Sequence, residues 1–147
     1  MTEWPVALRG TTETVVTTRG PNDRWNVAAL GVQASERAGF GTATTWGNTR
    51  TRRNFHREGG GYVQFVSDPV VFADAALSIR EEDEPVLDAA DAWAEVDAAH
   101  VDTDESGGTR REHWELHPVE TAVVRASPAT INRGFNAVVE ATVAASR

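Results

Sequence analysis

The sequence predicts a small antiparallel β-barrel whose ends are covered by helices, a fold that is mainly β with some α structure. Segments rich in valine, threonine and aromatic residues outnumber the segments with helical periodicity. The predicted strands also follow one another mostly as hairpins, whereas a parallel doubly wound sheet would alternate strands with helices. With 147 residues the chain is long enough for one core, so we expect residues 1–147 to form a single domain.

The first half of the chain is predicted to form three strands, a short helix and a fourth strand. In order, these are a strand at residues 7–18, a strand at 25–33, a loop at 34–41, a strand at 42–46, a helix near 48–57 and a strand at 62–66. The turn Gly20-Pro21-Asn22-Asp23 joins the first two strands as a hairpin, because these residue types suit turn geometry. Gly59-Gly60-Gly61 is predicted to be a turn, or a place where the backbone approaches a ligand or a second subunit.

The second half is predicted to contain two helices and a pair of strands. In order, these are a helix at residues 69–79, an acidic solvated connector at 81–84, a strand at 93–102, a strand at 111–118 and a C-terminal helix at 131–147 that packs on the barrel. Residues 88–101 suit a helix by propensity and a strand by alternation. The clean alternation around Trp114 and Leu116 needs a partner strand, which favours the strand. Pro69 suits a first helical turn, and Asn132 can cap the last helix.

The charge balance limits the partners that the protein can have. Net charge is −8, all fourteen basic side chains other than histidine are arginine, and the chain has no cysteine. An acidic, lysine-free chain suits a high-salt cytoplasm and disfavours a nucleic-acid partner, which needs a basic surface. No apolar run approaches the length of a membrane span, and no signal-peptide pattern is present. We therefore expect a cytoplasmic protein with no membrane contact and no disulfide.

An arginine-rich segment around the first helix is the strongest functional feature. Its arginines are Arg50, Arg52, Arg53 and Arg57, and the polar side chains among them are Thr44, Thr45, Asn48, Thr49, Thr51 and Asn54. A helix that begins at Asn48 or Thr49 presents free N–H groups and the positive end of its dipole. Arginines and hydroxyls beside such a helix end form an anion site, most naturally for a phosphate. The alternative is that the arginines are an ordinary solvated helix face.

Two residues outside the arginine run are further binding candidates. Trp46 ends the strand that leads into this helix, and a flat ligand could lie against its ring. Arg133 opens the last helix, where it is either a surface arginine beside the cap or a second arm on the same anionic ligand.

Several common kinds of active site are not predicted. We find no nucleophile elbow and no acid–base pair, so no catalytic residue is assigned. His113 and His117 are about 13 Å apart on a strand, too far for one metal ion. The glycine triplet leads into a strand, whereas a dinucleotide-binding fingerprint leaves a strand and opens a helix.

Four runs of the sequence resemble an archaeal family of unknown function that has the FMN-binding split β-barrel fold and is related to flavin reductases. They are WNVAALG at residues 25–31, WGNTRTRRNF at 46–55, GYVQF at 61–65 and NRGF at 132–135. The resemblance covers nearly the whole chain, and the acidic, lysine-free composition is similar to that of a halophilic member.

The resemblance implies a homodimer with FMN at the subunit interface. Flavin reductases of this fold carry an Asp-Thr-x-x-Asn element that helps to hold the FMN phosphate. Thr51 and Asn54 match its last two named residues, but Arg50 stands in place of the aspartate. Asn26 and Ala28 resemble the strand whose backbone lies along the flavin ring. The FMN-binding residues expected on these grounds are Asn26, Ala28, Thr45, Trp46, Asn48, Thr49, Arg50, Thr51, Arg53, Asn54 and Arg133.

The resemblance also implies a redox function that needs no catalytic acid, because the flavin carries the electrons. One hypothesis is a flavin reductase-like oxidoreductase that uses NADH or NADPH as donor. The alternative is an FMN-binding carrier or sensor without turnover, and a third idea is a site for some other phosphate ligand. The sequence does not separate the first two.

Overall fold

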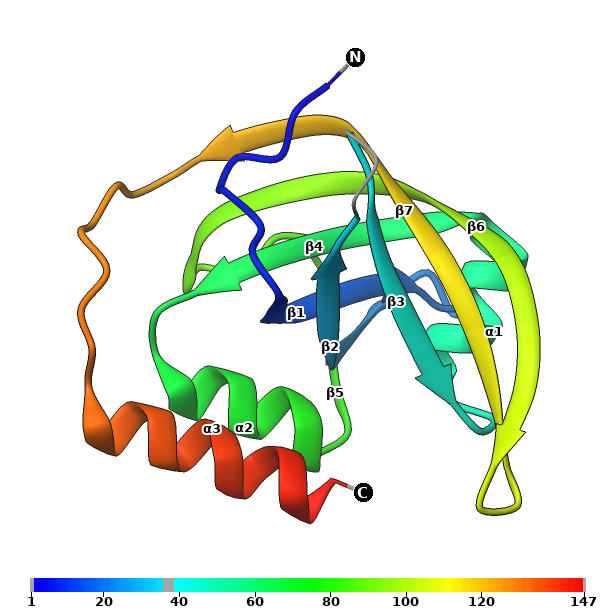
Figure 1. Cartoon of the computed structure of the whole chain (residues 1–147). Coiled ribbons are helices and arrows are strands. Elements are labelled where there is room, and N and C mark those ends of the chain that lie inside the picture. Colours follow the sequence, from blue (N-terminus) through cyan, green and yellow to red (C-terminus); the bar gives the residue numbers. More distant parts are fainter. Residues whose placement is uncertain (1, 36–38, 147) are drawn as a thin grey trace.

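The computed structural model describes residues 2–35 and 39–146, and it confirms the predicted β-barrel with helices (Figure 1). The barrel strands follow the order β1-β4-β6-β7-β3-β2, and β1 also pairs with β2, which closes the ring. All of these pairings are antiparallel. A short seventh strand, β5, pairs with β2. Within the described residues, no helix has the length and apolar character needed to cross a membrane.

The elements agree with most of the predicted ones. The strands are β1 Thr11–Arg19, β2 Trp25–Ala34, β3 Gly41–Trp46, β4 Gly60–Val66, β5 Arg80–Glu82, β6 Ala90–Ser106 and β7 Thr109–Val123, and the helices are α1 Arg50–Glu58, α2 Pro69–Leu77 and α3 Arg133–Ala145. Residues 88–101, which suited both helix and strand, belong mostly to β6. Part of the predicted loop at 34–41 lies outside the described residues.

Several predicted boundaries are wrong, and the strands predicted at 93–102 and 111–118 are longer, as β6 and β7. The connector at residues 81–84 is not simply solvated, because Glu81 and Glu82 belong to β5 and pair with Asn26 and Trp25 of β2. A strand as short as β5 does not show a clear alternation of side chains, so the sequence pattern could not reveal it. The first strand begins at Thr11 rather than at residue 7.

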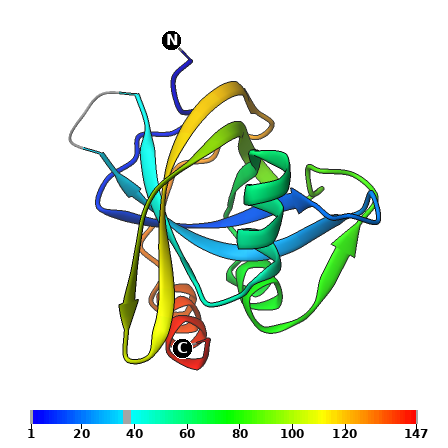
Figure 2. The ribbon, with the colours of Figure 1, turned by 90° about the vertical axis from the view of Figure 1, so that its right-hand side faces the viewer.

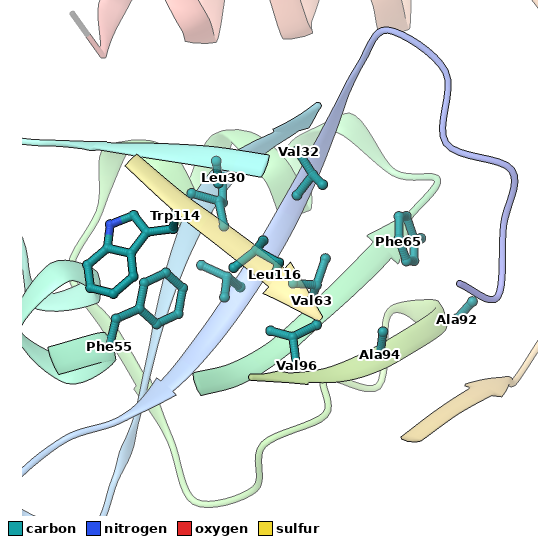
Figure 3. Packing of buried hydrophobic residues seen from close by; sticks show 12 residues of the cluster. Leu30, Val32, Phe55, Val63, Phe65, Ala92, Ala94, Val96, Trp114 and Leu116 are labelled. Atoms are coloured by element: carbon teal, nitrogen blue, oxygen red, sulfur yellow. The ribbon is translucent and has the colours of Figure 1, made fainter. Parts of the chain in front are cut away.

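The barrel interior is filled by side chains from alternate positions of the strands and from one face of α1 (Figure 3). Trp114 and Leu116 point inward from β7, as predicted, and are almost fully buried. Phe55 enters from α1, and its ring centroid lies 5.1 Å from that of Trp114. Burial of a Phe side chain contributes roughly 2–3 kcal/mol, so this contact fixes α1 against the barrel. Figure 2 shows α1 facing the viewer, with the long β6–β7 hairpin beside it.

The glycines after α1 serve strand packing. Gly59 ends α1 with a φ of 76°, the left-handed conformation that glycine adopts without strain. A Cβ atom on Gly60 would lie 2.1 Å from the carbonyl oxygen of Val96, and one on Gly61 would lie 2.5 Å from that of Thr17. The glycines therefore allow β4 to lie close to the neighbouring strands of the same barrel.

The barrel is split between β2 and β3. These strands pair only at Gln33↔Thr42 and Ala34↔Gly41, and then diverge (Figure 1). On the same edge of β2, β5 covers only residues 25–27. Residues 28–32 of β2 and 43–46 of β3 consequently have no strand partner on their facing edges within the described part of the chain.

The C-terminal helix α3 packs on α2, below the barrel in the view of Figure 1. Asn132 caps it, with its Oδ1 accepting a hydrogen bond from the backbone N–H of Phe135 at 3.0 Å. The face of α3 that carries Phe135, Val138 and Thr142 at helical spacing is only half covered, because Thr142 is buried while Phe135 and Val138 are exposed.

Candidate functional site

The N-terminus of α1 has free backbone donors, as the sequence predicted. Thr49 is the cap, and its Oγ1 accepts a hydrogen bond from the N–H of Arg52 at 3.2 Å. The N–H of Arg53 donates to the carbonyl of Thr49 at 3.1 Å. The N–H groups of Arg50 and Thr51 have no acceptor among the described residues. Two donors and the positive end of the helix dipole are thus available to an anion.

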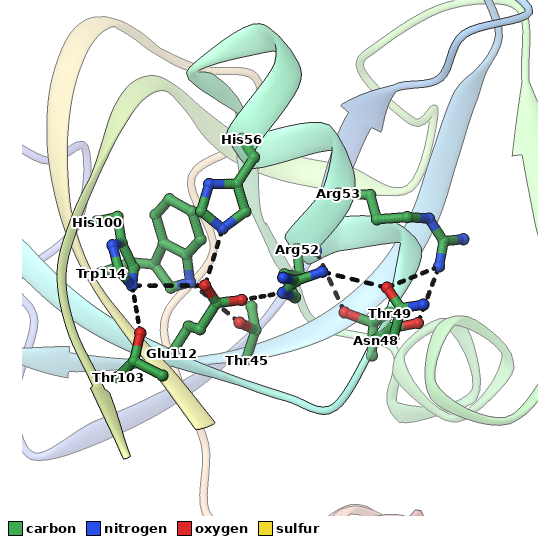
Figure 4. Close-up of polar contacts among 10 residues, drawn as sticks. All are labelled: Thr45, Asn48, Thr49, Arg52, Arg53, His56, His100, Thr103, Glu112 and Trp114. Carbon is green, nitrogen blue, oxygen red and sulfur yellow. Dashed lines mark hydrogen bonds and ion pairs between the residues drawn. The ribbon is translucent and has the colours of Figure 1, made fainter. Parts of the chain in front are cut away.

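Asn48 and Arg50 lie beside this helix end. Oδ1 of Asn48 accepts hydrogen bonds from Nη1 of Arg52 and Nη1 of Arg53, each at 3.2 Å (Figure 4). Arg50 is exposed, and its Nη1 lies 3.9 Å from Oε1 of Glu81 on β5. This ion pair brings the first residue of α1 next to the strand that pairs with Asn26.

Asn26 and Ala28 lie on β2 where the split begins, since Asn26 still pairs with Glu81 of β5 and Ala28 is the first residue beyond that pairing. Asn26 is mostly buried, and its side-chain amide makes no hydrogen bond with the described residues. Ala28 is partly buried and packs against the barrel core. A backbone contact is the role that the resemblance implies for this strand.

Three of the predicted ligand residues are occupied by the fold itself. Thr45 accepts a hydrogen bond from Nε1 of Trp114 at 3.0 Å and is buried. Asn54 is also buried; its Nδ2 donates to Oγ1 of Thr18 at 3.0 Å, and its Oδ1 accepts from Arg57 at 2.7 Å. Thr51 is buried as well, since it faces the barrel together with Phe55. The Thr-x-x-Asn match therefore fixes α1 to the barrel in this chain.

Trp46 and Arg133 have different surroundings. The Trp46 ring is 48% exposed, and the guanidinium of Arg111 lies 5.2 Å from its centroid. One face of the ring is therefore already stacked. Arg133 begins α3, which lies at the opposite side of Figure 1 from α1, so the two do not meet within one chain.

A cluster that the sequence interpretation missed lies on the other flank of α1. It lines an open cavity of about 510 Å³, which we call the basic pocket. Arg52, Arg53, His56 and Arg57 come from α1, and His100, Arg110 and Glu112 come from the β6–β7 hairpin. A buried carboxylate lies at its floor (Figure 4).

Glu112 is 2% exposed and joins three cationic or ionisable groups. It pairs with Nε of Arg52, with Nε2 of His56 at 2.9 Å and with Nε2 of His100 at 3.5 Å. Burial by itself raises the pKa of this carboxyl, but the hydrogen bonds from His56 and Arg52 and their charges outweigh burial and lower the pKa below its usual value. Glu112 is therefore ionised, and its contacts with Arg52 and His56 tie α1 to β7.

One sequence signal could have identified Glu112. It stands two residues before Trp114 and so shares the inward-facing positions of β7. A charged residue at an inward position needs a partner, but the sequence does not reveal which one. His113 and His117 point to the other side of β7, and no group of three or more potential metal ligands occurs among the described residues.

Solved structures with the same fold include FMN-bound and flavin-related proteins. An FMN-bound DUF447 protein from Methanosarcina mazei has a TM-score of 0.76 at 23% identity, over 94% of this chain and 75% of that chain. Nitrilotriacetate monooxygenase component B from Bacillus cereus has a TM-score of 0.61 at 12% identity, over 82% of this chain and 72% of that one. An FMN-binding protein from Thermus thermophilus has a TM-score of 0.57 at 14% identity, over 84% of this chain and 78% of that one.

At these identities the likeness establishes the fold, the flavin reductase-like split barrel. No curated protein is detectably similar to the chain. A family model, the N-terminal domain of a protein of unknown function (DUF447), matches residues 12–125. This match spans well over half of the sequence, and the chain accordingly belongs to the DUF447 family.

Proposed function

We propose that this protein binds FMN along the split between β2 and β3, with the phosphate at the N-terminus of α1. One observation carries the proposal: the unpaired facing edges of β2 and β3 lead to a helix end with two free N–H groups. Unpaired backbone groups are strong hydrogen-bonding sites. The polar edge of a flavin ring has alternating donors and acceptors, which complement a strand edge.

The residues around the split fit the parts of the cofactor. The N–H groups of Arg50 and Thr51, with the guanidinium of Arg50, suit a phosphate. The free amide of Asn26 and the exposed ring of Trp46 suit the ribityl chain and the ring system. The FMN-bound state of the Methanosarcina mazei member of the family gives independent support.

We further propose a flavin-dependent oxidoreductase that takes electrons from NADH or NADPH. FMN, when bound, supplies the capacity to accept electrons and pass them on. The chain's own residues then bind the phosphate, orient the ring and leave one ring face open. Fold relatives include the flavin reductase of styrene monooxygenase from Pseudomonas putida, with a TM-score of 0.50 at 15% identity. The alternative is a carrier or sensor in which the ring is covered.

A homodimer with the flavin at its interface is also part of the proposal. Large apolar side chains are exposed at several places on the described surface. Two of these places are the start of α3 with the residue before it, at Ile131, Phe135 and Val138, and the end of β7, at Val119, Val123 and Val124. Exposed apolar surface of this kind marks interaction sites. In a dimer, Arg133 could reach the ligand of the other subunit.

The test is an absorption spectrum of the full chain in high salt, taken after FMN is added and the sample is desalted. The expected result is a retained band near ~450 nm, the signature of a bound oxidised flavin. Bleaching of that band by NADH or NADPH under anaerobic conditions supports the oxidoreductase, and a retained but unbleached band supports the carrier. Loss of all flavin on desalting would remove the cofactor proposal. Sedimentation with and without FMN measures whether the chain forms a dimer and whether FMN promotes it.

A further inference from the structure

The basic pocket stands out against the charge of the whole molecule. The chain has a net charge of −8, and most of the described arginines lie within 4.0 Å of a carboxylate oxygen. The described arginines without such a partner are Arg9, Arg53, Arg110 and Arg133. Two of these four, Arg53 and Arg110, line the same cavity. Among the described residues that line it, the only carboxylate is Glu112, which pairs with Arg52 and forms a hydrogen bond with His56.

Several groups that line this pocket, although not the exposed Arg110, are held in place before any ligand arrives. Nη1 of Arg53 donates to the carbonyl of Asn48 at 2.9 Å, which leaves its other N–H groups free. The His56 and His100 rings pack against the buried Trp114 ring, with centroids 4.8 Å and 5.3 Å away. Nε2 of His100 also lies 2.8 Å from Oγ1 of Thr103. Fixed donors lose little entropy when they bind a ligand.

The pocket lies on a different side of α1 from the proposed flavin site. Arg50 reaches Glu81 on β5, whereas Arg52 reaches Glu112 on β7. Residues two positions apart are separated by roughly 200° around a helix, at about 100° per residue. Arg50 and Arg52 therefore point to different flanks of α1, and Arg53, which is bonded to Asn48 beside the helix end, lies between the two regions.

We propose that the basic pocket is a second anion-binding site, for a ligand that carries a phosphate ester or a diphosphate. Its volume of about 510 Å³ lies within the range of about 300–1,000 Å³ that is usual for small-molecule sites. Arginine forks favour phosphate oxygens with two parallel hydrogen bonds. Arg110, on the hairpin, and Arg53, on α1, would hold the ligand between them. The inference does not require the flavin proposal, because Arg110, His100 and Glu112 lie on the β6–β7 hairpin and only Arg53 adjoins the helix end proposed for the flavin phosphate.

The test is isothermal titration calorimetry of the full chain with inorganic pyrophosphate, at constant ionic strength, with and without saturating FMN. We expect the Arg110→Gln variant to bind pyrophosphate about 5–20-fold more weakly than the parent, in line with the loss of a charged hydrogen bond. Arg110 is exposed at the hairpin, and its side chain makes no hydrogen bond or ion pair with the described residues. Arg9→Gln is the matched control, since it removes the same charge from an exposed, unpaired arginine outside the pocket, and it should bind like the parent.

Three results would overturn the proposal. The first is that the parent chain does not bind pyrophosphate measurably. The second is that Arg9→Gln loses as much affinity for pyrophosphate as Arg110→Gln does. The third is that one equivalent of FMN displaces pyrophosphate, which would make the pocket part of the flavin site. NADP⁺ in place of pyrophosphate identifies the source of the phosphate. If NADP⁺ binds at least tenfold more tightly than pyrophosphate, and Arg110→Gln weakens that binding, the natural ligand is a nucleotide. If NADP⁺ binds no more tightly than pyrophosphate, the natural ligand is a smaller phosphate compound. A chain that binds pyrophosphate but retains no flavin would sink the FMN proposal and leave this one standing.

Discussion

Nε2 of His56 donates a hydrogen bond of 2.9 Å to Oε1 of Glu112 and so links the outer flank of α1 to a buried carboxylate on β7. Together with Arg52, this contact closes one side of the barrel end, while Phe55 fills the inside. The position of α1, and with it the position of both anion-attracting regions, depends on this pairing.

The first prediction concerns the dependence of stability on pH. The pKa of Glu112 is lower in the folded chain than its usual value of 4.5. The ionised carboxylate therefore stabilises the fold above about pH 4.5, and this contribution is lost as the pH falls through the lowered folded-state pKa. Glu112→Gln should reduce the free energy of unfolding by about 1–3 kcal/mol at pH 7, and by progressively less at lower pH.

Urea denaturation at a series of pH values measures this effect. Glu115→Gln is the control, because Glu115 lies on the same strand but its side chain is 35% exposed and pairs with the exposed His117. It should change stability by less than about 0.5 kcal/mol. A Glu112→Gln variant that matches the parent at pH 7 would show that the pairing does not hold α1.

The second prediction concerns the flavin phosphate. Arg50→Ala should raise the Kd for FMN about 5–30-fold, because one charged donor beside the free N–H groups of α1 is lost. Arg53→Ala should have a smaller effect, since the Arg53 side chain is already bonded to Asn48. Fluorescence titration measures both, and Arg9→Ala serves as the control. If Arg50→Ala binds FMN like the parent, the phosphate does not lie at this helix end.

The sequence was sufficient to predict features that depend on neighbouring residues. The helix start at Asn48 or Thr49, the alternation around Trp114 and the cap at Asn132 all follow from local residue types. The basic pocket could not be predicted, because it depends on which strand positions β6 and β7 bring beside α1. The same holds for β5 and for the split, since both are properties of backbone pairing that side-chain patterns do not record.

Asn54 shows how a correct local match can mislead about a role. Its spacing from Thr51 fits a phosphate-binding element, yet both side chains face the barrel. The pattern fixes where the helix lies, and the helix end then offers its backbone to a ligand. Sequence similarity alone does not distinguish a residue that contacts a ligand from one that positions the contact.

The third prediction tests the strand packing at the glycine triplet. Gly60→Ala would place a Cβ 2.1 Å from the carbonyl oxygen of Val96, a backbone atom that cannot move without disrupting β6. We expect a loss of at least about 2–3 kcal/mol. Gly107→Ala is the comparison, since Gly107 has a φ of 58° but a Cβ added there would meet no atom within 4 Å, and it should cost about 1 kcal/mol. Equal losses in thermal melts would mean that backbone conformation, not the close approach, explains Gly60.

The fourth prediction concerns salt. With a net charge of −8 the folded chain repels itself, and added salt screens that repulsion, with a Debye length of about 10 Å at 0.1 M and 3 Å at 1 M. The melting temperature should therefore rise between 0.1 M and 1 M KCl, and screening alone predicts a plateau above that. A further rise up to 3 M would indicate adaptation to a high-salt cytoplasm, as the lysine-free composition suggests. The measurement is differential scanning fluorimetry of the full chain, with the exposed-site variant Glu84→Arg as control, because its charge is less negative and its rise should be smaller. A melting temperature that is flat or falls with KCl would contradict the expectation that net charge limits the stability of this fold.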